Sequence, residues 1–313
     1  MNSLLFPGQG SQIVGMGSEL YNKFDLVKKI FKVADEKLKY SISKIILEGP
    51  EDQLKLTKNT QPAILIVSYS IFKILENEFN LNIKDFKFFA GHSLGEYSAL
   101  VCSKSLDFED ALYLLSERGK AMQEAVPIGK GCMLAVLGST LNELKKFIDS
   151  RLIKKGVCEI ANDNAEGQII VSGDNEDVNS LSLLLKEKKV KAIPLKVSAP
   201  FHCSLMLSAA DKMKEKIKNI KFNNPDLEII SNVNARPEND PSKIKELLIE
   251  QIYSTVKWRE SLTYMEKENV RNFIEIGPGK ALTGMVKRTL KNVNCFSINT
   301  IADINNFKNE FKK

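Results

Sequence analysis

The stretch Lys87-Phe88-Phe89-Ala90-Gly91-His92-Ser93-Leu94-Gly95 gives the strongest indication of fold and chemistry in this chain. Its apolar half predicts a buried strand, and the residues after Gly95 predict a helix that ends near Ser103. A G-x-S-x-G sequence between a strand and a helix is typical of a nucleophile elbow, a turn too tight for side chains at its flanking positions. Such a turn lifts Ser93 out of the sheet, above backbone amides that can hold an oxyanion. We expect Ser93 to be a nucleophile; the alternative is an ordinary glycine-bounded turn.

A serine nucleophile needs a general base, and the chain contains two histidines, His92 and His202. His92 is adjacent to Ser93, and neighbouring side chains on a sharp turn point apart. His202 follows the last strand of a predicted small domain, at a hinge that could bring it over Ser93. A lone histidine is more often a structural core residue, but His202 is the one eligible base. We therefore expect His202 to be the base.

The glycine-rich turn Gly8-Gln9-Gly10 near the N-terminus does not match a nucleotide-binding loop. The third glycine of G-x-G-x-x-G is absent because Ile13 occupies its position, and no Gly-Lys-Ser/Thr sequence follows. Hydrolase-like sites take their second oxyanion donor from a separate loop between a strand and a helix. The backbone amide of Gln9 is a candidate for that donor.

Arg118 lies on a helix predicted over Phe108–Val126, with Asp107 as its N-cap. The apolar residues of this helix, Met122 among them, form one face, and Arg118 falls on the border of that face. An arginine at such a border usually extends its guanidinium to water. The alternative is that Arg118 points into a cleft and binds a carboxylate through two hydrogen bonds. Periodicity alone leaves both alternatives open.

Strands alternate with helices along most of the chain, which predicts an α/β fold with a mostly parallel, hydrolase-like sheet and helices on both faces. Pro62 suits the first position of a helix that runs to Phe79. The order strand, helix, strand, strand, helix, strand within 129–197 predicts an inserted ferredoxin-like α+β subdomain. Residues 1–128 and 198–313 then form the large catalytic domain. The elements predicted within the insertion are Cys132–Leu137, Leu141–Leu152, Val157–Ala161, Gln168–Ser172, Glu176–Lys188 and Val190–Val197.

Composition excludes several classes of protein. The net charge of +6 is not concentrated as in a nucleic-acid binder; it fits a lysine-rich surface or a basic face for an acidic or phosphate-bearing partner. The five cysteines include no CxxC pair, which argues against a disulfide framework and a zinc site. We expect no metal, no cofactor, no membrane span and no signal peptide, and hence a cytoplasmic protein.

The separated motifs of this chain together resemble the malonyl-CoA:acyl carrier protein transacylase family of bacterial fatty acid synthesis. The match runs nearly end to end, and no catalytic position departs from the family pattern. The matching segments are Phe6–Gln12, Thr60–Ala63, Gly91–Leu100, Arg118–Gln123, Ala199–His202, Ser231–Val233, Gln251 and Glu275–Gly279.

This resemblance implies a role for each site residue. It makes Ser93 the nucleophile and His202 a base without a triad carboxylate, oriented by the backbone carbonyl of Gln251. It places the oxyanion between the amides of Gln9 and Leu94. The substrate-binding residues that it implies are Arg118, which would pair with the free carboxylate of malonate, Met122, Gln251, and Phe201, which would crowd branched acyl chains.

The implied reaction moves malonyl from coenzyme A to the phosphopantetheine thiol of an acidic acyl carrier protein, through a malonyl-serine intermediate. We expect a monomer that binds malonyl-CoA, coenzyme A and the carrier, with a narrow cleft between its domains. Three alternatives remain: a serine esterase or thioesterase, a polyketide-type acyltransferase, and a non-enzymatic scaffold that binds carriers. An esterase would normally place an Asp or Glu between Ser93 and His202 in chain order.

Overall fold

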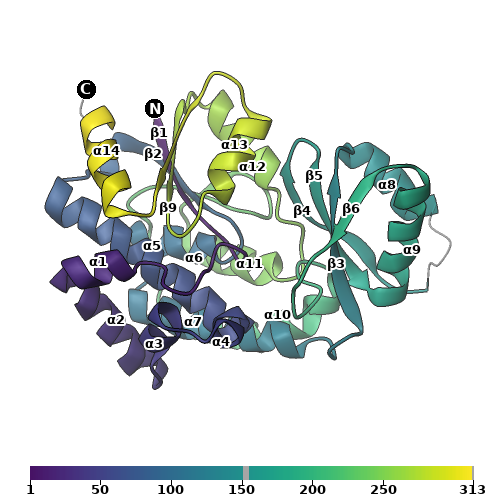
Figure 1. The fold of residues 1–313 in the computed structure, drawn as a ribbon, viewed down its shortest axis with the longest axis horizontal. Coiled ribbons are helices and arrows are strands. Elements are labelled where there is room, and N and C mark those ends of the chain that lie inside the picture. The colour runs from purple at the N-terminus through teal and green to yellow at the C-terminus, as the bar shows by residue number, and fades with distance from the viewer. Residues whose placement is uncertain (151–154, 312–313) are drawn as a thin grey trace.

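Two lobes, each with its own β-sheet, make up the computed structural model, which describes residues 1–150 and 155–311 (Figure 1). The large lobe contains a six-stranded sheet in the order β10-β9-β1-β2-β7-β8. All of its strand pairs are parallel except β7 with β8. The predicted mostly parallel sheet is therefore confirmed. Its strands are β1 (Asn2–Phe6), β2 (Phe86–Gly91), β7 (Ile229–Ile230), β8 (Pro237–Glu238), β9 (Asn272–Ile276) and β10 (Asn294–Ile298).

Helices cover both faces of this sheet because its central strands are apolar on both sides. In β1, Leu4 packs into one hydrophobic cluster, and Leu5 packs into the other. The larger cluster includes α5 (Thr57–Phe79) and α7 (Phe108–Glu124), and the smaller one includes α12 (Trp258–Lys267) and α13 (Ala281–Thr289). The remaining helices of this lobe are α1 (Ser18–Lys23), α2 (Asp25–Leu38), α3 (Ile42–Leu47), α4 (Glu51–Lys55), α6 (Gly95–Cys102), α10 (Leu207–Asn219), α11 (Pro241–Gln251) and α14 (Ile301–Phe311).

The small lobe is a four-stranded antiparallel sheet in the order β4-β5-β3-β6 with two helices (Figure 1). Its chain order is strand, helix, strand, strand, helix, strand, as expected for a ferredoxin-like subdomain. The boundaries at 129 and 197 stay a prediction. The elements are β3 (Gly131–Leu137), α8 (Leu141–Ser150), β4 (Cys158–Ala165), β5 (Gln168–Asp174), α9 (Asn175–Glu187) and β6 (Lys191–Pro194). The predicted end of its first helix, Leu152, lies outside the described residues.

Some predicted elements need correction. Helix α5 begins at Thr57, so Pro62 lies inside the helix and not at its first position. The residues of α5 that precede Pro62 pack closely against α7. A Cβ atom on Gly119 of α7 would lie 2.6 Å from the carbonyl oxygen of Thr57. After α13 the chain forms β10 and α14. Within the described residues, no helix is long and apolar enough to cross a membrane.

Candidate active site

The predicted elbow is present between β2 and α6, and its two glycines are required by close contacts. A Cβ atom on Gly91 would lie 1.9 Å from the carbonyl carbon and oxygen of Gly95. A Cβ atom on Gly95 would lie 2.1 Å from the carbonyl oxygen of Phe6, on the neighbouring strand. Ser93 itself has a φ of 53°, in the left-handed region that non-glycine residues rarely adopt. Such strain persists where the surrounding structure holds it, as at many functional sites.

Ser93 and His202 form a hydrogen-bonded pair. The Ser93 Oγ lies 2.8 Å from Nε2 of His202, and Nδ1 of His202 lies 2.8 Å from the carbonyl oxygen of Gln251. A carbonyl can only accept, so Nδ1 carries the proton, and Nε2 is left to accept one from the serine hydroxyl. Within the described residues, no carboxylate hydrogen-bonds His202. The pair therefore has the geometry of a dyad, with a backbone carbonyl in place of a triad acid.

Burial keeps the His202 imidazole neutral. His202 is 5% exposed, and burial, followed by the nearby positive charge of Arg118, lowers its pKa to about 3. A neutral imidazole is the form that can accept a proton from serine. His92 is placed differently, because its Nε2 lies 2.7 Å from Oδ1 of Asn164 and its ring packs edge-on against Trp258. The structure thus directs His92 away from Ser93 and toward the small lobe.

Arg118 is a buried cation beside the nucleophile. Its side chain is only 1% exposed, so it does not extend to water. The guanidinium donates hydrogen bonds to the side-chain oxygens of Gln61 and Gln251, each at 2.8 Å, and to the Ser93 Oγ at 3.2 Å. Burial lowers its pKa, but an arginine stays charged in a protein. In the described part of the chain it has no ion pair. A buried charge without a counter-ion is costly, and a bound carboxylate would offset that cost.

Two polar residues complete the site, and sequence reasoning assigned neither of them a role. Asn232 accepts a hydrogen bond from the backbone amide of Ser93 at 2.7 Å. Glu96 accepts one from the backbone amide of Asn232 at 3.0 Å and one from Nε2 of Gln251 at 2.8 Å. A signal for Glu96 exists in the sequence, because it is the one charged residue of the helix Gly95–Cys102. A charge on an otherwise apolar helix indicates a buried polar partner.

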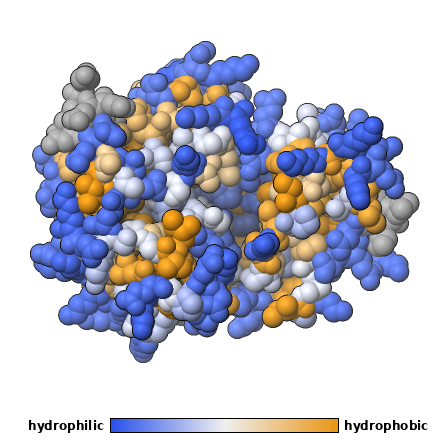
Figure 2. Space-filling view, viewed as in Figure 1, coloured by the Kyte–Doolittle hydropathy of each residue, from blue (hydrophilic) through white to orange (hydrophobic). Residues whose placement is uncertain are grey.

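A cavity of about 570 Å³ opens above Ser93, between the lobes. The large lobe contributes Arg118, and the small lobe contributes Met133 and Ile170. Figure 2 shows the surface hollowed between the lobes, with hydrophobic residues on the small-lobe side. A cleft is therefore present between the lobes, where one was expected. Of the other predicted site residues, those that line the cavity are Gln9, Leu94, Met122, Phe201 and His202.

Gln9 and Leu94 line this cavity. Their backbone amides have no hydrogen-bond partner among the described residues. Free amides beside a nucleophile suit an oxyanion hole. Gln251, in contrast, is fully buried behind Arg118 and does not line the cavity. Its position suits the orientation of neighbouring groups better than direct contact with substrate. In the described part of the chain, no cluster of His, Cys, Asp and Glu could hold a metal ion.

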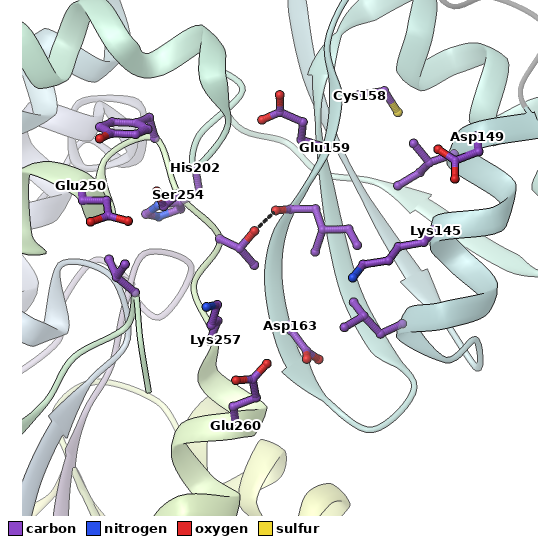
Figure 3. A pocket seen from close by; sticks show the side chains of 16 residues that line it. Lys145, Asp149, Cys158, Glu159, Asp163, His202, Glu250, Ser254, Lys257 and Glu260 are labelled. Atoms are coloured by element: carbon purple, nitrogen blue, oxygen red, sulfur yellow. Dashed lines mark hydrogen bonds between the residues drawn. The ribbon is translucent and has the colours of Figure 1, made fainter. Parts of the chain in front are cut away.

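A second cavity, of about 680 Å³, also lies at the junction between the lobes (Figure 3). It also reaches His202, and its wall carries side chains of both charges, such as Lys145 and Glu260. Thr255 of the large lobe donates a hydrogen bond of 2.5 Å to the backbone of Ile160, drawn as a dashed line in Figure 3. Nearby, Arg259 binds Asp163 with a shortest distance of 2.7 Å. These contacts fix the small lobe against the large one.

Comparisons with known proteins agree with this geometry. The sequence pattern of the acyl transferase domain family matches residues 4–311 of this chain. A malonyl CoA-acyl carrier protein transacylase of Bacillus subtilis is 44% identical over 298 residues, which cover 95% of this chain and 92% of that protein.

Solved structures are similar over the same length. An acyl-carrier-protein S-malonyltransferase of Bartonella henselae aligns with a TM-score of 0.96 at 38% identity, over 100% of this chain and 99% of that one. A malonyl-transacylase in complex with a type II polyketide synthase acyl carrier protein aligns with a TM-score of 0.93 at 35% identity, over 97% of each chain. By its sequence, its fold and its near-complete coverage of these relatives, the chain belongs to the malonyl-CoA:acyl carrier protein transacylase family of acyltransferases.

Proposed function

We propose that this chain transfers malonyl from malonyl-CoA to the phosphopantetheine thiol of acyl carrier protein. The product, malonyl-acyl carrier protein, then serves fatty acid synthesis. One observation carries the substrate assignment: the Arg118 guanidinium is buried, lacks an ion pair in the described residues and lies 3.2 Å from the Ser93 Oγ. Malonyl-CoA brings a free carboxylate close to its reactive thioester, and guanidinium matches a carboxylate with two parallel hydrogen bonds. The pairing would place the thioester at the nucleophile.

In the first half-reaction, His202 Nε2 takes the proton of the Ser93 hydroxyl while the serine oxygen attacks the thioester carbonyl. The amides of Gln9 and Leu94 hold the oxyanion that forms. The carbon–sulfur bond then breaks, and the leaving coenzyme A sulfur takes the proton from His202. A malonyl ester remains on Ser93.

In the second half-reaction, the carrier thiol gives its proton to His202 and attacks the malonyl-serine ester. The ester oxygen of Ser93 leaves and takes the proton back, so that the free enzyme returns. Coenzyme A must depart before the carrier thiol reacts, which makes the scheme ping-pong. The position of Ser93 supports this order, because it lines one cavity between the lobes that both thiols would have to enter.

The partners follow from this scheme. Lys55 and Lys196 line the cavity and would attract the phosphates of coenzyme A or an acidic carrier. The solved complex of a related transacylase with its carrier supports a direct docking of carrier protein here. We infer a monomer located in the cytoplasm.

A polyketide-type acyltransferase is the second candidate, because the carrier in that complex belongs to a type II polyketide synthase. An esterase is disfavoured, because in the described residues His202 contacts a carbonyl and not a carboxylate. It would also gain nothing from Arg118.

The test supplies malonyl-CoA with the phosphopantetheinylated carrier of either pathway and measures malonyl-carrier and free malonate together. The proposal expects malonyl-carrier to form much faster than malonate, with the fatty acid carrier preferred. Equal or faster release of malonate would refute it in favour of a hydrolase. A preference for the polyketide carrier would assign the second candidate.

A further inference from the structure

The lone glutamate of helix α6 has no role in the mechanism above, yet it lies next to the reacting groups. Glu96 is 3% exposed, and burial raises the pKa of its carboxyl to about 7. Burying a carboxyl group costs several kcal/mol unless hydrogen bonds compensate it. Its position, three residues after Ser93 on the helix that follows the elbow, therefore needs an explanation in its contacts.

A single oxygen of Glu96 holds two neighbouring residues. Oε2 accepts from the backbone amide of Asn232 at 3.0 Å and from Nε2 of Gln251 at 2.8 Å. Asn232 in turn forms two hydrogen bonds with the elbow. Its Oδ1 accepts from the Ser93 amide at 2.7 Å, and its Nδ2 donates to the Gly91 carbonyl at 2.7 Å. Glu96 is thus connected through Asn232 to the strained backbone of Ser93.

The contact with Gln251 has a second consequence. A glutamine amide can flip and exchange its donor and acceptor ends, but Oε2 of Glu96 already accepts from the Asn232 amide and so offers Gln251 an acceptor. Nε2 of Gln251 also donates to the Ser93 carbonyl oxygen at 3.1 Å, so two acceptors hold Nε2 on this side and leave Oε1 toward Arg118, which donates to it at 2.8 Å. A flipped amide would place its NH₂ group against the guanidinium. Glu96 and the Ser93 carbonyl together set the orientation of the amide that holds Arg118, and Glu96 makes the shorter of the two contacts.

We propose that Glu96 is a positioning residue for acyl transfer, which fixes Gln251 and Asn232 so that Arg118 and Ser93 keep their places for a carboxylate-bearing substrate. This inference rests on the proposed function. The Glu96 carboxyl also lies near Arg118 without a direct ion pair in the described residues, so the guanidinium remains available to the substrate. A direct pair with Glu96 would have occupied the hydrogen bonds that malonate needs.

The variants Glu96→Gln and Glu96→Ala separate positioning from simple filling of space. Oε2 takes both hydrogen bonds, so the single carbonyl oxygen of glutamine can take both as well. We expect E96Q to keep kcat/KM for malonyl-CoA within about threefold of wild type, a change smaller than the loss of one hydrogen bond to a charged group. E96A removes both hydrogen bonds: the Asn232 amide loses its acceptor, and Nε2 of Gln251 keeps only its longer bonds, the shorter of them 3.1 Å to the Ser93 carbonyl. We expect kcat/KM for malonyl-CoA to fall about 10- to 100-fold.

The decisive readout is the ratio of kcat/KM for malonyl-CoA to that for acetyl-CoA. Acetyl does not use Arg118, so E96A should lower this ratio by roughly tenfold, whereas a folding defect would lower both rates together. An unchanged ratio in E96A, or an E96Q variant as impaired as E96A, would overturn the proposal. If E96A does not fold, Glu96→Asp, whose carboxylate is one methylene shorter, should show the same selective loss; an unchanged ratio there would also overturn it.

Wild type in the same assay distinguishes this proposal from the proposed function. A wild-type protein that makes no malonyl-carrier refutes the function itself. Active wild type with unaltered selectivity in the variants refutes only the role of Glu96.

Discussion

Replacing Arg118 with alanine should change which acyl group is preferred. The substitution removes a guanidinium that is 1% exposed and bound to Gln61, Gln251 and the Ser93 Oγ. Loss of these bonds leaves two amide oxygens without a partner, and that cost falls on every substrate alike. Malonyl-CoA loses in addition a desolvated charge pair, whose truncation costs roughly 2–5 kcal/mol. At about 1.4 kcal/mol per decade, kcat/KM for malonyl-CoA should fall about 30- to several-thousand-fold more than that for acetyl-CoA.

The assay compares malonyl-, acetyl- and octanoyl-CoA with wild type, Arg118→Ala and Arg118→Lys, with circular dichroism as the check on folding. Lysine keeps the charge but not the two-pronged geometry, so we expect it to recover part of the malonyl preference. Turnover of acetyl- and octanoyl-CoA should be affected far less. Equal losses on all three substrates would refute the reasoning, because they would mean that Arg118 supports the fold or binds the phosphates of coenzyme A.

Three further predictions concern the dyad and the elbow. His202→Ala should leave the circular dichroism spectrum unchanged and slow acylation roughly 10²–10⁴-fold in a burst assay; normal bursts would point to another base. The lowered pKa of His202, about 3, keeps its base form present as the pH falls, so the acylation rate should show no midpoint near the ordinary histidine pKa of about 6.5. Gly95→Ala should lower the melting temperature strongly, whereas Gly284→Ala, whose Cβ meets nothing within 4 Å, should not; equal melting temperatures would contradict the contact with Phe6.

The elbow could be predicted from the sequence because its determinants are local. Two glycines, a strand before them and a helix after them define the turn, and the observed contacts at Gly91 and Gly95 explain both glycines. His202 could be selected because the chain offers few bases. Its orientation by the carbonyl of Gln251 came from the family resemblance, since no periodicity reveals a contact between segments so far apart.

The burial of Arg118 could not be predicted from the periodicity of its helix. Its helix shows it on the border of an apolar face, but its burial depends on Gln61 of α5 and Gln251 of α11, which reach it from distant parts of the chain. The lone charge of Glu96 on its helix predicts burial, but its partners Asn232 and Gln251 cannot be predicted, because they lie far away in sequence. Strand β10 is hard to predict from the sequence, because it lies at the edge of the sheet and is only partly buried, so its apolar and polar residues alternate weakly.

The central claim is that Ser93 carries the malonyl group between the two thiols. The most direct measurement is the intact mass of wild type and Ser93→Ala after mixing with malonyl-CoA, followed by peptide mapping of the adduct. We predict a mass increase of one malonyl group on the peptide that contains Ser93, its loss when carrier thiol is added, and no adduct on the variant. A malonyl adduct on Ser93→Ala, or one that maps to another residue of wild type, would contradict the account.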